Sequence, residues 1–183
     1  MELINRKIKV HKSLHELFGQ ETTWFDLFAI LLGSILLTIV TQILCIESEL
    51  TTAKKIVLAV LTLDIGGGVI ANFTEGTNNY YSENIKIRYL FILTHFLQPL
   101  VLLWIFTENL FFILIITLFT LISSMIVTVI KDYGIQRIAA ISFLLIGVLI
   151  SFLLPFSNQV LQLILIVYSI KLILAFSVNW NSR

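Results

Sequence analysis

The sequence predicts an all-α, polytopic integral membrane protein built as a bundle of six transmembrane helices. Hydrophobic residues make up 58% of the 183 residues and charged residues only 13%, and the mean hydropathy of +0.98 lies outside the range of soluble domains. The apolar residues fall into six stretches of about the length that crosses a bilayer. Inside lipid, such a stretch satisfies its own backbone hydrogen bonds only as a helix.

The expected spans cover residues 24–45, 56–73, 87–106, 110–130, 138–154 and 160–178. Only the polar residues 107–109 separate the third span from the fourth, which indicates a tight helical hairpin. The fifth span ends before Pro155, and the turn at 156–158 offers polar caps. We therefore expect one transmembrane domain over 24–178 and a short tail over 179–183.

The first 23 residues are polar and lack the apolar core of a signal peptide, so we expect the first span to remain as an anchor. Basic residues alternate there with apolar ones such as Ile8, Leu14 and Leu17. This mixture favours an amphipathic helix lying on an anionic inner leaflet, and a disordered tail is the alternative.

The distribution of lysine and arginine predicts the orientation of the chain. If the loops alternate between the two sides, Lys54 and Lys55 fall on one side. The other side receives Arg6, Lys7, Lys9, Lys12, Lys86, Arg88, Lys131, Arg137 and Arg183. This bias predicts that both termini are cytoplasmic in a multi-pass protein of the cell membrane. With a net charge of +1 and scattered basic residues, we expect membrane lipids as partners and no nucleic acid.

Asp64 is the most informative residue, because it lies in the middle of an expected span with no basic residue within helical reach. An ionisable side chain in hydrocarbon costs several kcal/mol, so it is expected to face the protein interior and to have a function there. The three glycines at 66–68 cost roughly 1 kcal/mol each relative to alanine in a helix. Close packing against another helix would explain them, and so would a helix that opens toward a ligand.

His95 is the expected partner of Asp64. Each lies roughly 12–13 Å from the cytoplasmic end of its own span at 1.5 Å per residue, so their depths match on consecutive helices. A carboxylate beside an imidazole is a proton-transfer pair. Pro99 cannot donate to the carbonyl of His95, which predicts a kink and a free carbonyl oxygen there. Lys171 either neutralises Asp64 or extends toward the interface.

Further polar residues extend this site toward the cytoplasmic edge of the membrane. Asp64, Gly68, Asn72 and Glu75 share one helix face, and a polar loop is expected over 74–81. Asp64 and His95 are the predicted catalytic residues. The predicted substrate-binding residues are Asn72, Thr74, Glu75, Asn78, Arg88, Gln98 and Lys171. The sequence assigns no metal site and identifies no cofactor; if a metal takes part, Asp64, His95 and Glu75 are the expected ligands.

These residues favour a membrane-embedded enzyme whose site opens to the cytoplasmic leaflet and acts on a lipid or another amphipathic substrate by acid/base chemistry. A small proton-coupled transporter is one alternative, and it is expected to work as a homo-oligomer, because six short helices enclose little volume. A non-catalytic accessory or immunity protein, in which the polar groups only hold helices together, is another. A partial dinucleotide fingerprint at Gly66, Gly68 and Ala71 is discounted, because no strand precedes it.

Overall fold

The computed structural model describes residues 6–82, 85–154 and 158–181, and six of its helical segments are long and apolar enough to cross a membrane. Their helices are α2 (Trp24–Leu44), α3 (Thr52–Phe73), α5 (Ile85–Thr94), α6 (Leu97–Ile105), α7 (Leu110–Val129), α8 (Tyr133–Leu153) and α9 (Gln159–Ser169). The third span combines α5 and α6, and the sixth continues from α9 into a π-helix, η3 (Ile170–Phe176). The prediction of an all-α bundle with six such helices is confirmed.

Polar caps explain where several helices begin. Thr23 and Asp26 form a capping box at the start of α2, with reciprocal bonds of 3.1 and 3.0 Å between side chain and backbone. Thr51 caps α3 and Asp132 caps α8, so both helices begin a few residues before their predicted starts. Asn158 caps α9 as expected, whereas 155–157 lie outside the described residues.

Helices α2 and α3 form a closely packed hairpin. A Cβ atom placed on Gly66 would lie 2.7 Å from the carbonyl oxygen of Gly33 and 3.0 Å from Cβ of Leu37. Any residue larger than glycine at 66 would therefore force the two backbones apart. Helix α3 continues without interruption through all three glycines, so close packing explains them and an opened helix does not.

The third span bends at His95 and Phe96, between α5 and α6, four and three residues before Pro99. The predicted kink is confirmed. The expectation of a free carbonyl at His95 is wrong, because the hydroxyl of Tyr168 and the backbone N–H of Gln98 both donate to it at 3.3 Å. A neighbouring helix thus satisfies the group that the proline leaves without its usual partner.

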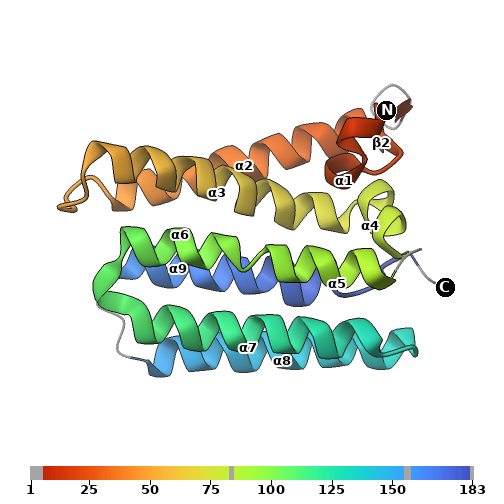
Figure 1. The fold of residues 1–183 in the computed structure, drawn as a ribbon. Helices are drawn as coiled ribbons and strands as arrows, with labels where there is room; N and C mark the ends of the chain where they lie inside the picture. The colour runs from red at the N-terminus through yellow and green to blue at the C-terminus, as the bar shows by residue number, and fades with distance from the viewer. Residues whose placement is uncertain (1–5, 83–84, 155–157, 182–183) are drawn as a thin grey trace.

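The sixth span lies at the centre of the bundle. Figure 1 shows α9 behind α6, between the α2–α3 hairpin and the α7–α8 pair. Its π-helical continuation η3 contacts α3, α7 and α8, and Lys171 and Leu172 within it are buried. A short 3₁₀ turn, η2 (Thr107–Asn109), makes the expected hairpin connection between α6 and α7.

The N-terminal residues form a small folded unit that packs on one end of the bundle (Figure 1). The unit contains β1 (Lys7–Lys9), a 3₁₀ turn η1 (Lys12–Leu14), α1 (His15–Phe18) and β2 (Glu21–Thr23), and the two strands pair antiparallel. The structure therefore corrects the expectation of one amphipathic helix or a disordered tail. Gly19, at φ 72°, returns the chain into β2, which explains why no long helix forms.

A second correction concerns the residues after α3. The stretch expected as a polar loop is a helix, α4 (Glu75–Ser82), capped by the hydroxyl of Thr74. Helix α4 packs on α1 and β2, and the backbone of Gly76 touches that of Gly19. A Cβ atom at Gly19 would meet the backbone of Gly76, and one at Gly76 would meet the carbonyl oxygens of Glu21 and Phe18, so neither position admits a side chain. These contacts join the N-terminal unit to the bundle.

Candidate functional site

A cavity of about 290 Å³ lies between α3 and the bent helix pair α5–α6. We call it the lateral cavity, because most of its lining residues belong to these two spans. Lys171 of η3 lies at its inner side, and α1 and α4 contribute residues at one end. Its lining residues are Glu16, Leu17, Asp64, Gly68, Ala71, Asn72, Tyr81, Phe91, Thr94, His95, Leu97, Gln98 and Lys171.

Asp64 and Lys171 form an ion pair in this cavity. Nζ of Lys171 lies 3.2 Å from Oδ2 of Asp64 and 3.4 Å from its backbone oxygen. The lysine side chain is 2% exposed and the aspartate 53%, so the ammonium is enclosed while the carboxylate faces the open cavity. Lys171 therefore pairs with Asp64 and does not extend toward the membrane interface, because its side chain turns inward to α3.

Gly68 provides the space for the lysine. A Cβ atom at Gly68 would lie 2.8 Å from Nζ of Lys171 and still closer to Cε. The third glycine of the triplet therefore has a different role from Gly66, which faces α2. It allows a long cationic side chain to reach the carboxylate one helical turn away on the same face of α3.

Gln98 is the second residue that holds Asp64, since its Nε2 donates to Oδ2. No hydrogen bond from a described residue reaches the other carboxylate oxygen, Oδ1. Two buried groups of cavity-lining residues also have no partner within the described part of the chain: Oε1 of Gln98 and Nδ2 of Asn72. A buried polar atom without a partner costs about 1–3 kcal/mol.

His95 lines the same cavity but does not bond to Asp64. Its Nδ1 contacts the carbonyl oxygen of Phe91 at 2.7 Å, and its ring lies 4.0 Å from the Phe91 ring, which in turn stacks on Phe176 at 4.0 Å. Those contacts orient the imidazole along α5. The two predicted catalytic residues thus share a cavity, while the carboxylate is bonded to Lys171 and Gln98.

Three predicted substrate-binding residues make contacts that hold the fold together. Thr74 donates to the carbonyl of Ala71 at 2.7 Å, and Asn78 bonds the backbone of Val178 and Trp180, both at 2.9 Å. Arg88 donates to the carbonyl of Phe176 at 2.8 Å, with its guanidinium 5.7 Å from that ring. None of the three lines the lateral cavity.

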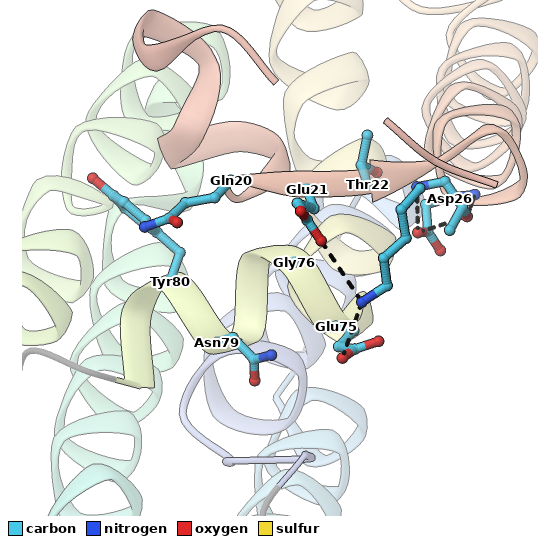
Figure 2. Close-up of a pocket in the computed structure, with 10 residues that line it drawn as sticks. Gln20, Glu21, Thr22, Asp26, Glu75, Gly76, Asn79 and Tyr80 are labelled. Atoms are coloured by element: carbon cyan, nitrogen blue, oxygen red, sulfur yellow. Dashed lines mark hydrogen bonds and ion pairs between the residues drawn. The ribbon is translucent and has the colours of Figure 1, made fainter. Parts of the chain in front are cut away.

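Glu75 belongs to a different cavity of about 220 Å³, between the N-terminal unit and α4. Figure 2 shows Glu21 and Glu75 on facing sides of it, with Asn79 and Tyr80 along α4. The ammonium of Lys7 lies 3.8 Å from Glu21 and 3.7 Å from Glu75. All three side chains are about half exposed, so these ion pairs contribute little stability.

Sequence reasoning missed the residues that close one end of the lateral cavity. The hydroxyl of Tyr81 donates to the carbonyl of Glu16 at 3.0 Å, and Thr77 donates to that of Leu17 at 3.1 Å. Burial raises the pKa of Tyr81, so its hydroxyl keeps the proton that this bond needs. No local pattern could have indicated these contacts, because more than 50 residues separate the partners.

The fold defines the class of the protein: a multi-spanning, all-α protein with six helices of membrane-crossing length and composition. Within that class, no protein-family model matches the chain, and no curated protein and no solved structure matches it either. The described residues contain no group of three His, Cys, Asp or Glu that could hold a metal. Asp64, His95 and Glu75, the residues considered as ligands, do not form one group, because Glu75 lines the other cavity.

Proposed function

We propose that the protein is a membrane-embedded enzyme that receives an amphipathic molecule in the lateral cavity and acts on its polar head by acid/base chemistry at Asp64. One observation carries the proposal. Oδ2 of Asp64 is held by Lys171 and Gln98, while the carboxylate is 53% exposed to the cavity and Oδ1 has no partner among the described residues. A positioned carboxylate with one committed and one open oxygen suits a proton acceptor.

The shape and rim of the cavity support an amphipathic substrate. The cavity lies between two spans, and Leu17 and Leu97 on its lining are exposed apolar side chains. An apolar tail would lie against such a rim, while the polar head would reach the ion pair. The predicted orientation would place the end near α1 and α4 on the cytoplasmic side.

In this proposal the residues divide the work. Lys171 and Gln98 hold the carboxylate in position, and Asn72 offers a donor to the substrate. Asp64 takes a proton from the head group or from a water molecule. His95 lines the same cavity, and its Nδ1 is bonded to the carbonyl of Phe91 and not to Asp64. Its other ring nitrogen therefore exchanges a proton with the bound molecule.

The test compares the protein with Asp64→Asn in lipid nanodiscs. Both are incubated with a total lipid extract, and mass spectrometry follows species consumed and formed. We expect product with the unaltered protein and a loss of about 100-fold or more in Asp64→Asn, as is usual when a proton-transfer group is removed. Glu108→Gln is the matched control, because it removes an exposed carboxylate in η2, outside the lateral cavity. Equal turnover by a folded Asp64→Asn protein would overturn the proposal.

The alternative of a proton-coupled carrier is favoured by the enclosed Lys171–Asp64 pair, since such pairs form proton relays in transporters. Vesicles containing the protein distinguish the two functions. A carrier takes up solute when a pH gradient is applied and forms no product. A purely structural pair predicts neither result, and Asp64→Asn then only lowers the melting temperature.

A further inference from the structure

We infer that the head group bound in the lateral cavity is a neutral hydroxyl, so that the ligand is a lipid-like alcohol and not a phosphate ester or an amine. The inference rests on the proposed function, because it names the substrate class of the same cavity. It follows from the hydrogen-bonding capacity that the lining residues leave unused.

His95 presents an acceptor. Its Nδ1 lies 2.7 Å from the carbonyl oxygen of Phe91, and a carbonyl only accepts, so Nδ1 carries the proton. In the neutral imidazole the other nitrogen, Nε2, is then a lone-pair acceptor and a base. No hydrogen bond to Nε2 is made by the described residues.

Two more acceptors belong to the same cavity. Oδ1 of Asp64 has no protein partner within the described residues, and Oε1 of Gln98 is buried without one, on a residue that is 9% exposed. The amide orientation of Gln98 follows from its bond to Asp64, because only its NH₂ group can donate to a carboxylate. A ligand that binds beside these acceptors must supply a hydrogen-bond donor, and a hydroxyl supplies one.

An anionic head would find no counter-charge. Lys171 is the lysine that lines the cavity, and its ammonium is 2% exposed and bonded to Asp64. The other formally charged lining residues, Asp64 and Glu16, are acidic. A phosphate placed beside these carboxylates would be repelled, and its oxygens would face acceptors instead of donors.

A cationic head is also disfavoured, because it would compete with Lys171 for the same carboxylate. An ammonium on Oδ1 would lie within a few ångströms of the ammonium held on Oδ2 at 3.2 Å. A hydroxyl leaves the ion pair intact and brings no second positive charge beside the ammonium of Lys171. Its remaining lone pairs accept from Nδ2 of Asn72, the buried donor without a partner among the described residues.

The test measures binding of four short-chain probes to the protein in phosphatidylcholine nanodiscs by native mass spectrometry. The probes share two octanoyl chains on glycerol and carry at the third carbon a hydroxyl, a methyl ether, a phosphate or an amine. We expect the alcohol to bind about tenfold or more tightly than the ether, because the ether has no hydrogen to donate to an acceptor of the cavity. The phosphate and the amine are expected to bind more weakly than the alcohol.

The variant His95→Phe removes one acceptor and keeps a ring of similar shape. It should reduce the preference for alcohol over ether while leaving ether binding unchanged. His11→Phe is the matched control, because His11 is exposed and does not line the lateral cavity. An ether that binds as tightly as the alcohol, tighter binding of phosphate or amine, or no binding of any probe would each overturn the inference.

These outcomes are separate from those of the proposed enzyme activity. Selective binding of the alcohol without any product would refute the proposed enzyme activity and support the inferred ligand class. If product forms from a lipid extract and is lost in Asp64→Asn, but the alcohol is not preferred, the activity is supported and the inferred ligand class is refuted.

Discussion

Asp64 owes its position to contacts from three elements. It lies on α3, its carboxylate receives the ammonium of Lys171 from η3 and the amide of Gln98 from α6, and its open side faces the lateral cavity. An enclosed ammonium is costly to leave without a counter-charge, so the pair is coupled: each group stabilises the protein only while the other is present.

Removing one member of the ion pair should therefore destabilise the protein more than removing both. Lys171→Met fills similar space without charge and is expected to lower the free energy of unfolding by about 1–3 kcal/mol, less than a fully buried pair would, because Asp64 is 53% exposed. Asp64→Asn leaves the enclosed ammonium without its carboxylate and should cost a similar amount. Thermal unfolding in detergent measures both variants.

The double variant decides the point. If the pair is coupled, the double variant with Lys171→Met and Asp64→Asn unfolds at a higher temperature than either single variant. Strictly additive losses would show that the two side chains contribute independently, contrary to the 3.2 Å contact between them.

At the scale of elements, the glycines of α3 lie on two faces of the helix and have different roles. Gly66 lets α2 approach, and Gly68 lets the side chain of Lys171 from η3 cross α3. A π-helix is rare and is frequently found at functional sites, and here it carries the lysine that pairs with the candidate catalytic residue. Packing of α3 on both neighbours thus shapes the wall of the cavity.

Gly68→Ala tests this packing. Its methyl group would lie 2.8 Å from Nζ of Lys171, so the flexible end of the lysine must shift and its bond to the Asp64 carboxylate is disturbed. We expect weaker probe binding and slower turnover, although alanine is the better helix former by up to about 1 kcal/mol. Gly134→Ala on α8 is the control, because a Cβ there meets only Oδ1 of Asp132, at 3.3 Å. Unchanged binding in Gly68→Ala would contradict the assigned role.

On the scale of the whole molecule, the N-terminal unit closes one end of the lateral cavity. It is held through α4 by the Tyr81–Glu16 and Thr77–Leu17 hydrogen bonds and by the contact of Gly19 with Gly76. Helix α4 also holds the C-terminal residues, because the amide of Asn78 bonds Val178 and Trp180. Residues near both ends of the chain therefore lie at this end of the bundle (Figure 1).

The raised pKa of Tyr81 predicts a loss of stability in alkali. Burial keeps its hydroxyl protonated in the folded protein, whereas in the unfolded chain a tyrosine releases its proton near pH 10. The unfolded state then binds fewer protons, so the free energy of unfolding falls as the pH rises above about 10. Tyr81→Phe should be less stable by about 1 kcal/mol at neutral pH and should show a shallower decline. Urea unfolding from pH 7 to 11 measures both, and an identical slope in the variant would refute the prediction.

The predicted orientation is tested by labelling single cysteines. In a Cys45→Ala background, Lys12→Cys lies on the N-terminal unit and Glu49→Cys on the connection between α2 and α3, at the other end of these helices. Because basic residues favour the cytoplasm, a membrane-impermeant maleimide should label Glu49→Cys in intact cells and Lys12→Cys only after permeabilisation. The reverse pattern would invert the topology.

Much of the architecture was predictable because the bilayer reduces it to length and hydropathy. Six apolar stretches, the hairpin at Thr107–Asn109 and the bend before Pro99 follow from local composition, and the structure has all three. The N-terminal unit and α4 were not predicted correctly, because each depends on the other: Gly19 and Gly76 are 57 residues apart in sequence and touch in the fold.

The sequence by itself determined that Asp64 needs a partner, since the cost of an isolated charge in an apolar span is a local property. Only the tertiary structure decided that the partners are Lys171 and Gln98, and that His95 shares the cavity without bonding to the carboxylate. The physical reason is that depth along a helix can be computed from sequence, whereas the rotation of one helix against another follows from close contacts such as those at Gly66 and Gly68.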